Sequence, residues 1–280
     1  MRESEEKPVI IHGHSVVDGA GVRIRRVFGF DDTELTDPFL LLDAFGSDNP
    51  DDYMDGFPWH PHRGIETITF MINGTVEHAD SLGNRGTISD GCVQWMTAGS
   101  GVIHQEMPEP YDGMMRGFQL WLNLPAEQKM TPPRYRDIDA KAIPCVQKDA
   151  SAVRVISGTF EDAEGAAKEL ITAPDLFDIE LDAGGKIDLT AKSGNRSIFF
   201  VYEGSITLEG ERLYTGDCAI FREKIEFTAE SFGGRARVLF FSGTPLQEPV
   251  AWRGPIVMNS DEELDLAFLE LKEGHFLKKP

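Results

Sequence analysis

Short apolar runs recur along the chain, and turns that contain glycine separate them. Between residues 67 and 122 these runs include Thr67–Ile72, Thr75–Ala79, Cys92–Met96, Val102–His104 and Phe118–Leu122. Runs of this length, evenly spaced and without a long helical period, are typical of an antiparallel β-barrel or jelly roll. We therefore predict an all-β fold, with the Asn73-Gly74 dipeptide forming a tight hairpin between the first two runs.

Two segments carry a helical pattern instead. Near the C-terminus, Ser260 can cap a helix, with Glu263 completing a capping box and Gly274 ending the run. The apolar positions between them fall at i, i+3, i+4 and i+7, namely Leu264, Ala267, Phe268 and Leu271. This spacing predicts an amphipathic helix that packs on a barrel. Glu161–Leu170 predicts a second, short helix, although a glycine in its middle disfavours it.

Composition and charge restrict the class of partner. The 280 residues carry a formal net charge of -20, which repels phosphate backbones, so we expect no direct nucleic-acid binding. The three cysteines are odd in number and widely spaced, which favours a reducing compartment. No secretory signal or membrane-length apolar run is present. We therefore expect a cytoplasmic protein with no membrane partner.

Two pairs of side chains have the spacing of metal ligands. His60 and His62 lie two residues apart, and so do His104 and Glu106. In an extended strand, residues two apart project to the same face, so each pair can contribute two ligands if the two strands are neighbours in a barrel. Three imidazoles and a carboxylate suit Fe, Mn, Ni, Cu or Zn and leave room for water, dioxygen or an organic ligand. Glu66 lies an even number of residues from His60 and His62, so in a regular strand it projects to the same face. Spacing alone therefore leaves it as an alternative carboxylate ligand.

Another histidine pair carries less weight. His12 and His14 flank a glycine, a turn follows, and no second pair of ligands is nearby. We interpret this pair as a polar strand end.

The strand pattern occurs twice. Ala126–Ala150 contains Pro132-Pro133 and has no periodicity, so we interpret it as a linker. After it, Val201–Gly204 resembles Met71–Gly74, and Gly216–Phe221 resembles Asp90–Trp95. No histidine occurs between His104 and His275, so the second copy cannot rebuild a three-histidine site. We predict a metal-binding domain over residues 1–138 and a domain without a metal site over residues 139–280.

These motifs resemble those of cupins, and in particular of the pirin family, whose members contain two cupin barrels. The cupin elements are His60, His62, Glu66, Gly74, Gly101 and His104. Residues 57–67 and 94–108 look like the two pirin metal motifs, and the segments 18–26, 117–125 and 248–259 also match. The resemblance implies two antiparallel cupin barrels, Fe²⁺ bound in the first barrel by His60, His62, His104 and Glu106, and no metal in the second. It therefore selects Glu106 over Glu66.

The same resemblance implies two functions. The first is a quercetin 2,3-dioxygenase-like oxidoreductase, whose partners are a small aromatic flavonol-type substrate and dioxygen, with Glu106 as general base. The alternative is a non-catalytic iron-binding regulator that acts through a protein partner. Aromatic and apolar residues that flank the ligands could line the substrate pocket or belong to the barrel core, namely Phe57, Trp59, Trp95 and Met96. By analogy with the family, Gln119 is a candidate partner of the ligands.

Overall fold

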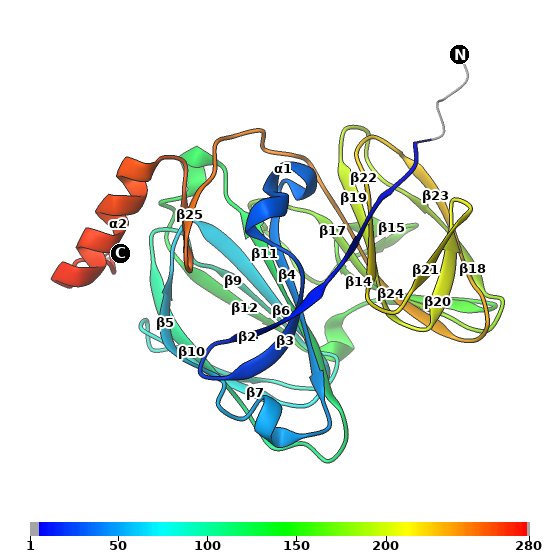
Figure 1. The fold of residues 1–280 in the computed structure, drawn as a ribbon, viewed down its shortest axis with the longest axis horizontal. Helices are drawn as coiled ribbons and strands as arrows, with labels where there is room; N and C mark the ends of the chain where they lie inside the picture. The colour runs from blue at the N-terminus through cyan, green and yellow to red at the C-terminus, as the bar shows by residue number, and fades with distance from the viewer. Residues whose placement is uncertain (1–5, 279–280) are drawn as a thin grey trace. The chain divides into compact units, whose positions relative to one another are not determined.

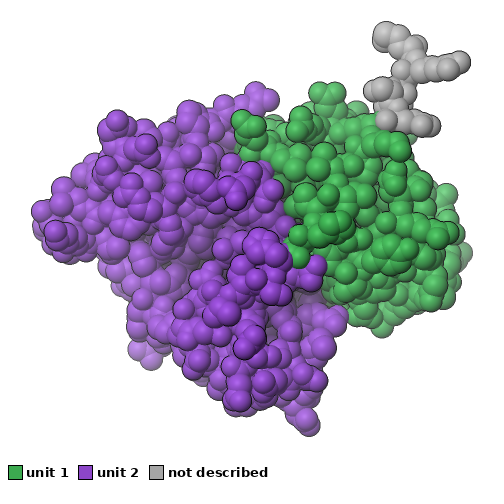
Figure 2. Space-filling view, in the orientation of Figure 1, with its two compact units in different colours: residues 1–13, 34–38, 141–245 green, residues 14–33, 39–140, 246–280 purple. Residues whose placement is uncertain are grey.

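The computed structural model describes residues 6–278, which form two compact units (Figures 1 and 2). The described part of unit 1 comprises residues 6–13, 34–38 and 141–245, and that of unit 2 comprises residues 14–33, 39–140 and 246–278. Nearly all regular structure in both units is β, so the all-β prediction is confirmed.

Unit 2 contains a seven-stranded and a four-stranded antiparallel sheet. The larger sheet has the order β12 (Arg134–Ile138), β9 (Val93–Thr97), β6 (Ile65–Asn73), β11 (Met115–Asn123), β4 (Phe39–Ser47), β3 (Val22–Phe28) and β2 (His14–Asp18). The smaller sheet has the order β5 (Phe57–His62), β10 (Val102–Pro108), β7 (Val76–Asp80) and β8 (Arg85–Ile88). Buried side chains from both sheets, such as Met71 and Val76, meet in one core, so the sheets enclose a barrel interior.

Unit 1 repeats this architecture with its own core. Its larger sheet has the order β1 (Val9–His12), β22 (Asp217–Phe221), β19 (Arg196–Glu203), β24 (Ala236–Gly243), β17 (Asp175–Leu181), β14 (Ser151–Ser157) and β13 (Cys145–Lys148). Its smaller sheet has the order β18 (Lys186–Thr190), β23 (Glu226–Ser231), β20 (Ser205–Leu208) and β21 (Glu211–Tyr214). Strand for strand, β22 and β19 occupy the places of β9 and β6. The duplication inferred from Val201–Gly204 and Gly216–Phe221 therefore reflects two barrels of one topology.

The remaining elements are short. Two-stranded sheets are formed by β15 (Thr159–Phe160) with β16 (Ala163–Glu164), and by β25 (Ala251–Arg253) with β26 (Ile256–Met258). The helices are α1 (Thr33–Thr36) and α2 (Asp261–Glu273), with four 3₁₀ turns at Phe30–Asp32, Pro50–Asp52, Ala126–Gln128 and Ala140–Ala142. Neither helix of residues 6–278 has the length and apolarity needed to cross a membrane.

Three local predictions were wrong. Asn73-Gly74 does not close a hairpin, because β6 and β7 belong to different sheets and the Gly74 amide instead donates to Asp90 at 2.6 Å. The segment expected to be a linker without regular structure contains β12 and β13, which are edge strands of the two larger sheets. The helix expected over Glu161–Leu170 is replaced by the β15–β16 hairpin, in which Glu161 has a positive φ of 51°.

The C-terminal helix forms as predicted. The Glu263 amide donates to the Ser260 hydroxyl, and Gly274 ends the helix in the left-handed conformation with φ of 77°. The Glu263 carboxylate accepts from the Asn259 amide, one residue earlier than a capping box requires. Leu264 and Ala267 are buried against β25 and β26.

The compact units follow the predicted division at residues 138 and 139 only in part. The main change of unit falls close by, between residues 140 and 141, but residues 6–13 and 34–38 lie in unit 1, and residues 246–278 lie in unit 2 with the first barrel. Buried contacts explain this placement, because the Arg63 guanidinium donates to Glu270 at 2.7 Å and to the Phe276 carbonyl at 2.7 Å. The C-terminal segment is therefore structurally part of the barrel that carries the histidine pairs.

Candidate metal centre

Three histidines converge in unit 2 because β5 and β10 are paired. His60 lies directly opposite His104 in the antiparallel register, and His62 follows two residues later on the same strand. The His60 Nε2 lies 3.0 Å from the Nε2 of His62 and 3.0 Å from the Nε2 of His104. Within residues 6–278, these three side chains form the one group of three or more histidine, cysteine or acidic residues that could hold a metal ion, with their ligand atoms all within 4.8 Å of one another.

The other ring nitrogen of each histidine is held by a partner. His60 Nδ1 donates to the Pro58 carbonyl at 2.9 Å, and His62 Nδ1 donates to the Pro255 carbonyl at 3.2 Å. A carbonyl only accepts, so both rings carry their proton on Nδ1 and leave the Nε2 lone pair free. His104 Nδ1 lies 3.3 Å from the Tyr135 hydroxyl, which can accept the same kind of hydrogen bond. The three rings are therefore oriented as metal-binding histidines are.

This arrangement fits a divalent metal ion. Two unprotonated nitrogens 3.0 Å apart repel each other unless a cation lies between them. Metal–nitrogen bonds of about 2.1 Å at right angles separate two nitrogens by about 3.0 Å, which matches both measured Nε2 distances. The donor set of three imidazoles suits Fe, Mn, Ni, Cu or Zn.

Burial keeps two of the rings neutral. The pKa of His62 is lowered well below its usual value, first by burial and then by the neighbouring His60. Burial also lowers the pKa of His104, and the rings of His62, His60 and His78 lower it further. Neutral imidazole is the form that binds a metal, so the ligand form persists well below pH 6.5.

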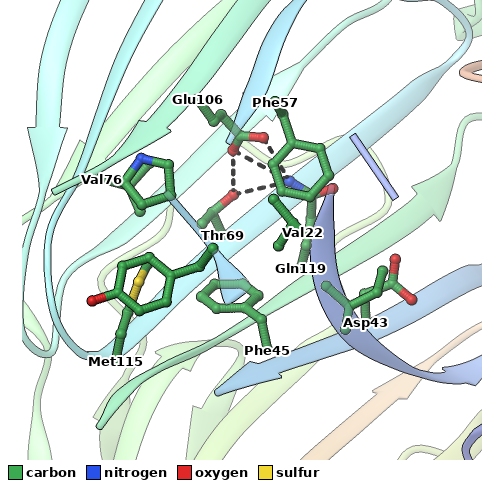
Figure 3. A pocket seen from close by; sticks show the side chains of 12 residues that line it. Val22, Asp43, Phe45, Phe57, Thr69, Val76, Glu106, Met115 and Gln119 are labelled. Carbon is green, nitrogen blue, oxygen red and sulfur yellow. Dashed lines mark hydrogen bonds between the residues drawn. The ribbon is translucent and has the colours of Figure 1, made fainter. Parts of the chain in front are cut away.

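Glu106 lies beside this cluster and is not a member of it. Its side chain is buried on the same face of β10 as His104. Gln119 Nε2 donates to both carboxylate oxygens, at 3.2 and 3.0 Å, and the Thr69 hydroxyl donates to one of them at 3.1 Å (Figure 3). Trp121 Nε1 donates to Gln119 Oε1 at 3.0 Å, which turns the amide nitrogen of Gln119 toward the carboxylate. Ligation of a metal by Glu106 remains a prediction, whereas its contact with Gln119 agrees with expectation.

Glu66 lies on a different face. A turn at Gly64, with φ of 78°, separates β5 from β6, and an added Cβ there would lie 1.9 Å from the Val257 carbonyl oxygen. The alternation of side chains that places His60 and His62 on one face therefore does not continue into β6. Glu66 pairs with Thr97, whose hydroxyl donates to it at 2.7 Å, on the face of the sheet opposite Thr67 and Thr69.

An open cavity of about 570 Å³, which we call the entrance cavity, leads to His60 and His62. Its aromatic walls are Phe30, Phe57, Trp121 and Trp252, and its polar walls include Asp18, Arg26, Asp43 and Gln119. The Trp121 ring meets the His62 ring edge-on, with centroids 5.0 Å apart. A planar aromatic molecule would find flat apolar contacts beside the histidines.

Only one of the four residues suggested as pocket walls lines this cavity. Phe57 lines it, whereas Trp59 is 52% exposed and Trp95 and Met96 are buried core residues. Sequence reasoning missed Trp121 and Trp252. The signal for Trp121 was its place two residues after Gln119 on one strand face, but Trp252 reaches the cavity from a segment 130 residues away, which no local pattern reveals.

Other histidines have different surroundings. His12 Nδ1 lies 2.7 Å from the Asp217 carboxylate at the exposed edge of unit 1, in agreement with a polar strand end. His78, on β7 opposite Glu106, is buried and stacks on Tyr135 with ring centroids 5.8 Å apart. Its Nε2 faces Asp137 at 3.6 Å, and the proximity of His78 lowers the pKa of Asp137. The Tyr135 ring thus joins His78 to the ligand cluster through His104.

Comparison with known families gives two matches that together cover most of the chain. Residues 21–122 match the model described as Pirin, and residues 176–277 match the model described as Pirin C-terminal cupin domain. A protein of Pseudomonas aeruginosa, provisionally named quercetin 2,3-dioxygenase, is 48% identical over 270 residues, which cover 94% of each chain.

Solved structures agree with this result. A crystal structure titled quercetin 2,3-dioxygenase from Acinetobacter baumannii is 36% identical and superimposes with a TM-score of 0.90, covering 98% of this chain and 99% of that one. A bacterial pirin of Escherichia coli in complex with nickel(II) is 19% identical, with a TM-score of 0.66 over 85% of this chain and 99% of that one. At that identity the second likeness shows the fold alone.

Proposed function

Because the chain belongs to the pirin family and both of its barrels are cupin domains, we propose that it is a metal-dependent dioxygenase that cleaves the ring of flavonol-type substrates. In this proposal, His60, His62, His104 and Glu106 hold Fe²⁺ in unit 2. The names of its relatives support the reaction class, and the three convergent imidazoles support the metal.

One observation carries the proposal, namely that three Nε2 atoms converge at a cavity with aromatic walls. A redox-active divalent metal bound there would supply a Lewis acid for a substrate oxygen and electrons for reaction with dioxygen. The 570 Å³ entrance cavity is within the size range of small-molecule sites. Phe57, Trp121 and Trp252 would orient a planar ring and keep water from its faces.

Glu106 is the residue we assign to proton transfer. A flavonol binds more strongly to a cation as its anion, so its hydroxyl must lose a proton to a nearby base. Gln119 and Thr69 hold the Glu106 carboxylate beside the imidazoles and fix its orientation. A carboxylate bound tightly to a cation is a poor base, so this role requires that Glu106 be held loosely by the metal.

The test is oxygen uptake by the protein after anaerobic loading with Fe²⁺, with quercetin as the flavonol. We expect one dioxygen consumed per ring cleaved, and a loss of roughly 100-fold or more in turnover for His60→Ala and His104→Ala, because each removes a ligand. His12→Ala serves as the matched control, since His12 lies in unit 1 and pairs with Asp217.

The result can also separate the enzyme from the regulatory alternative. Tight binding of quercetin without oxygen uptake would contradict the dioxygenase proposal and favour a non-catalytic iron-binding regulator. A protein that binds no divalent metal, and whose histidine variants behave as the wild type, would exclude both functions.

A further inference from the structure

A second, much smaller cavity of about 30 Å³ lies next to Glu106 in the interior of unit 2 (Figure 3). We call it the inner cavity. Most of its wall is apolar and comes from β3, β4, β7 and β11 through Val22, Ile24, Phe45, Val76 and Met115. Glu106, Thr69 and Gln119 form its polar end, where Figure 3 shows them bonded to one another.

The polar groups that border the inner cavity already have partners. Both oxygens of Glu106 accept from Gln119, and the Gln119 carbonyl accepts from Trp121. The Asp43 carboxylate accepts from Arg26 at 2.9 and 2.7 Å, and the Tyr53 hydroxyl accepts from the amide of Tyr111 at 3.2 Å. A buried water needs two to four hydrogen-bond partners, whereas apolar cavities stay dry and take apolar guests. The inner cavity therefore favours a small apolar molecule over water.

The volume of the inner cavity limits which molecules it can hold. A cavity that binds benzene has a volume of about 150 Å³, and a single water needs at least about 10–15 Å³. At about 30 Å³ the inner cavity is too small for an aromatic ring and large enough for a diatomic gas. A flavonol would therefore stay in the entrance cavity.

The two cavities have walls in common. Phe57, Asp43 and Gln119 line both of them. A guest in the inner cavity would thus be separated only by side chains from a substrate in the entrance cavity, with Glu106 beside it.

We propose that the inner cavity is a binding site for dioxygen, distinct from the site of the aromatic substrate. This inference rests on the proposed function, because it assigns a place to the second substrate of that reaction. With separate sites, both substrates can be bound at the same time. A flavonol in the entrance cavity would then not block access of dioxygen, because dioxygen would already occupy the inner cavity.

Xenon is a suitable probe because it is apolar, binds dry cavities and does not react. We expect xenon to shift the methyl NMR signals of Val76 and Met115 in the wild-type protein. The shift of the Met115 signal should be lost in Val76→Leu, which fills the cavity with one methylene. In oxygen-uptake assays, Val76→Leu should raise KM for dioxygen on the order of tenfold more than KM for quercetin. Tenfold is about the smallest change in discrimination that one methylene causes in an apolar pocket.

Val93→Leu is the matched control, because Val93 is equally buried in unit 2 but lines neither cavity. The inference is overturned if xenon leaves the Val76 and Met115 signals unchanged, or if KM for dioxygen rises equally in the two variants. Failure of the proposed function looks different. The loaded wild-type protein would then consume no oxygen with quercetin, whatever xenon does.

Discussion

Each residue of the site has its chemistry set by the atoms around it. The backbone carbonyls of Pro58 and Pro255 fix the protonated nitrogen of His60 and His62, and burial keeps the ring of His62 neutral. Glu106 accepts hydrogen bonds from Gln119 and Thr69, which fix the orientation of its carboxyl group. The three imidazoles are thus oriented as those of metal-binding histidines are, and the Glu106 side chain is fixed by its two hydrogen-bond partners.

Glu106→Gln tests the assignment of the base at this scale. The amide keeps the shape of the side chain but cannot take a proton, so we expect ring cleavage to fall by roughly 100-fold or more. Three imidazoles remain, so the variant should still bind Fe²⁺, which metal analysis of the purified protein would measure.

His14→Gln provides a comparison, because His14 lies outside the ligand cluster. Wild-type turnover by a metal-loaded Glu106→Gln protein would refute the role of Glu106 as base.

At the scale of elements, Lys129 joins three segments of unit 2. Its side chain is 1% exposed, and Nζ donates to Asn123 Oδ1 at 2.7 Å and to the carbonyls of Gly64 and Val257 at 3.0 and 3.1 Å. These acceptors lie at the end of β11, at the turn before β6 and on β26. The lysine therefore ties the C-terminal segment to the turn that follows the first histidine pair.

Burial lowers the pKa of Lys129 to about 7, against the opposing effect of Glu248 and Glu263. In the unfolded chain its pKa is near 10.5, so between these values the unfolded state binds one more proton than the folded state. Stability from this residue therefore increases as pH rises above 7, by at most about 1.4 kcal/mol per pH unit. Lys129→Met should lower the free energy of unfolding by about 1–3 kcal/mol near pH 7, because buried acceptors lose their donor, and the gap should widen toward pH 9.

Urea unfolding at pH 6, 7.5 and 9 measures this gap. Lys272→Met, which changes an exposed lysine of α2, should show no such dependence. A gap for Lys129→Met that stays constant with pH would mean that the folded protein leaves the pKa of this lysine at its ordinary value.

At the scale of the whole molecule, two barrels of one topology have different interiors. The interior of unit 1 is a continuous apolar core in which the rings of Phe199, Phe221, Phe227 and Phe240 contact one another. In unit 2 the equivalent smaller sheet carries the three histidines and Glu106, and two cavities adjoin them. Aromatic side chains thus fill the core of unit 1, whereas in unit 2 cavities adjoin the candidate site.

Metal binding should therefore stabilise one unit selectively. A metal at 100 times its dissociation constant adds about 2.7 kcal/mol to the state that binds it. Hydrogen exchange should slow in β5 and β10, and around Pro255, whose carbonyl holds His62, while β19 and β24 of unit 1 should exchange as before. Removal of the metal with a chelator should reverse the change.

Mass spectrometry of exchanged peptides, with and without Fe²⁺ under anaerobic conditions, gives this measurement. The His104→Ala protein should show no response to the metal. Equal protection of both units, or protection of unit 1 alone, would be inconsistent with a metal site built on β5 and β10.

The sequence by itself determined the features that depend on local periodicity. Alternation and glycine turns predicted the strands, repeated strand ends predicted two barrels, and the i, i+2 spacing placed His60 with His62 and His104 with Glu106 on common faces. The caps and apolar stripe of α2 were equally local. The strands, the ligand pairs and the helix depend on residues within a few positions of one another, and the repeat follows from comparing two such local patterns, so the chain order displays all of them directly.

Only the tertiary structure decided which strands are neighbours and which segments line the cavity at the candidate site. The break at Gly64 moved Glu66 away from the histidines, Asn73-Gly74 connected two sheets instead of closing a hairpin, and residues 246–278 joined the first barrel with Trp252 and Pro255 beside the site. The physical reason is that periodicity specifies which side of its own strand a residue occupies. It contains no information on what packs across from that side.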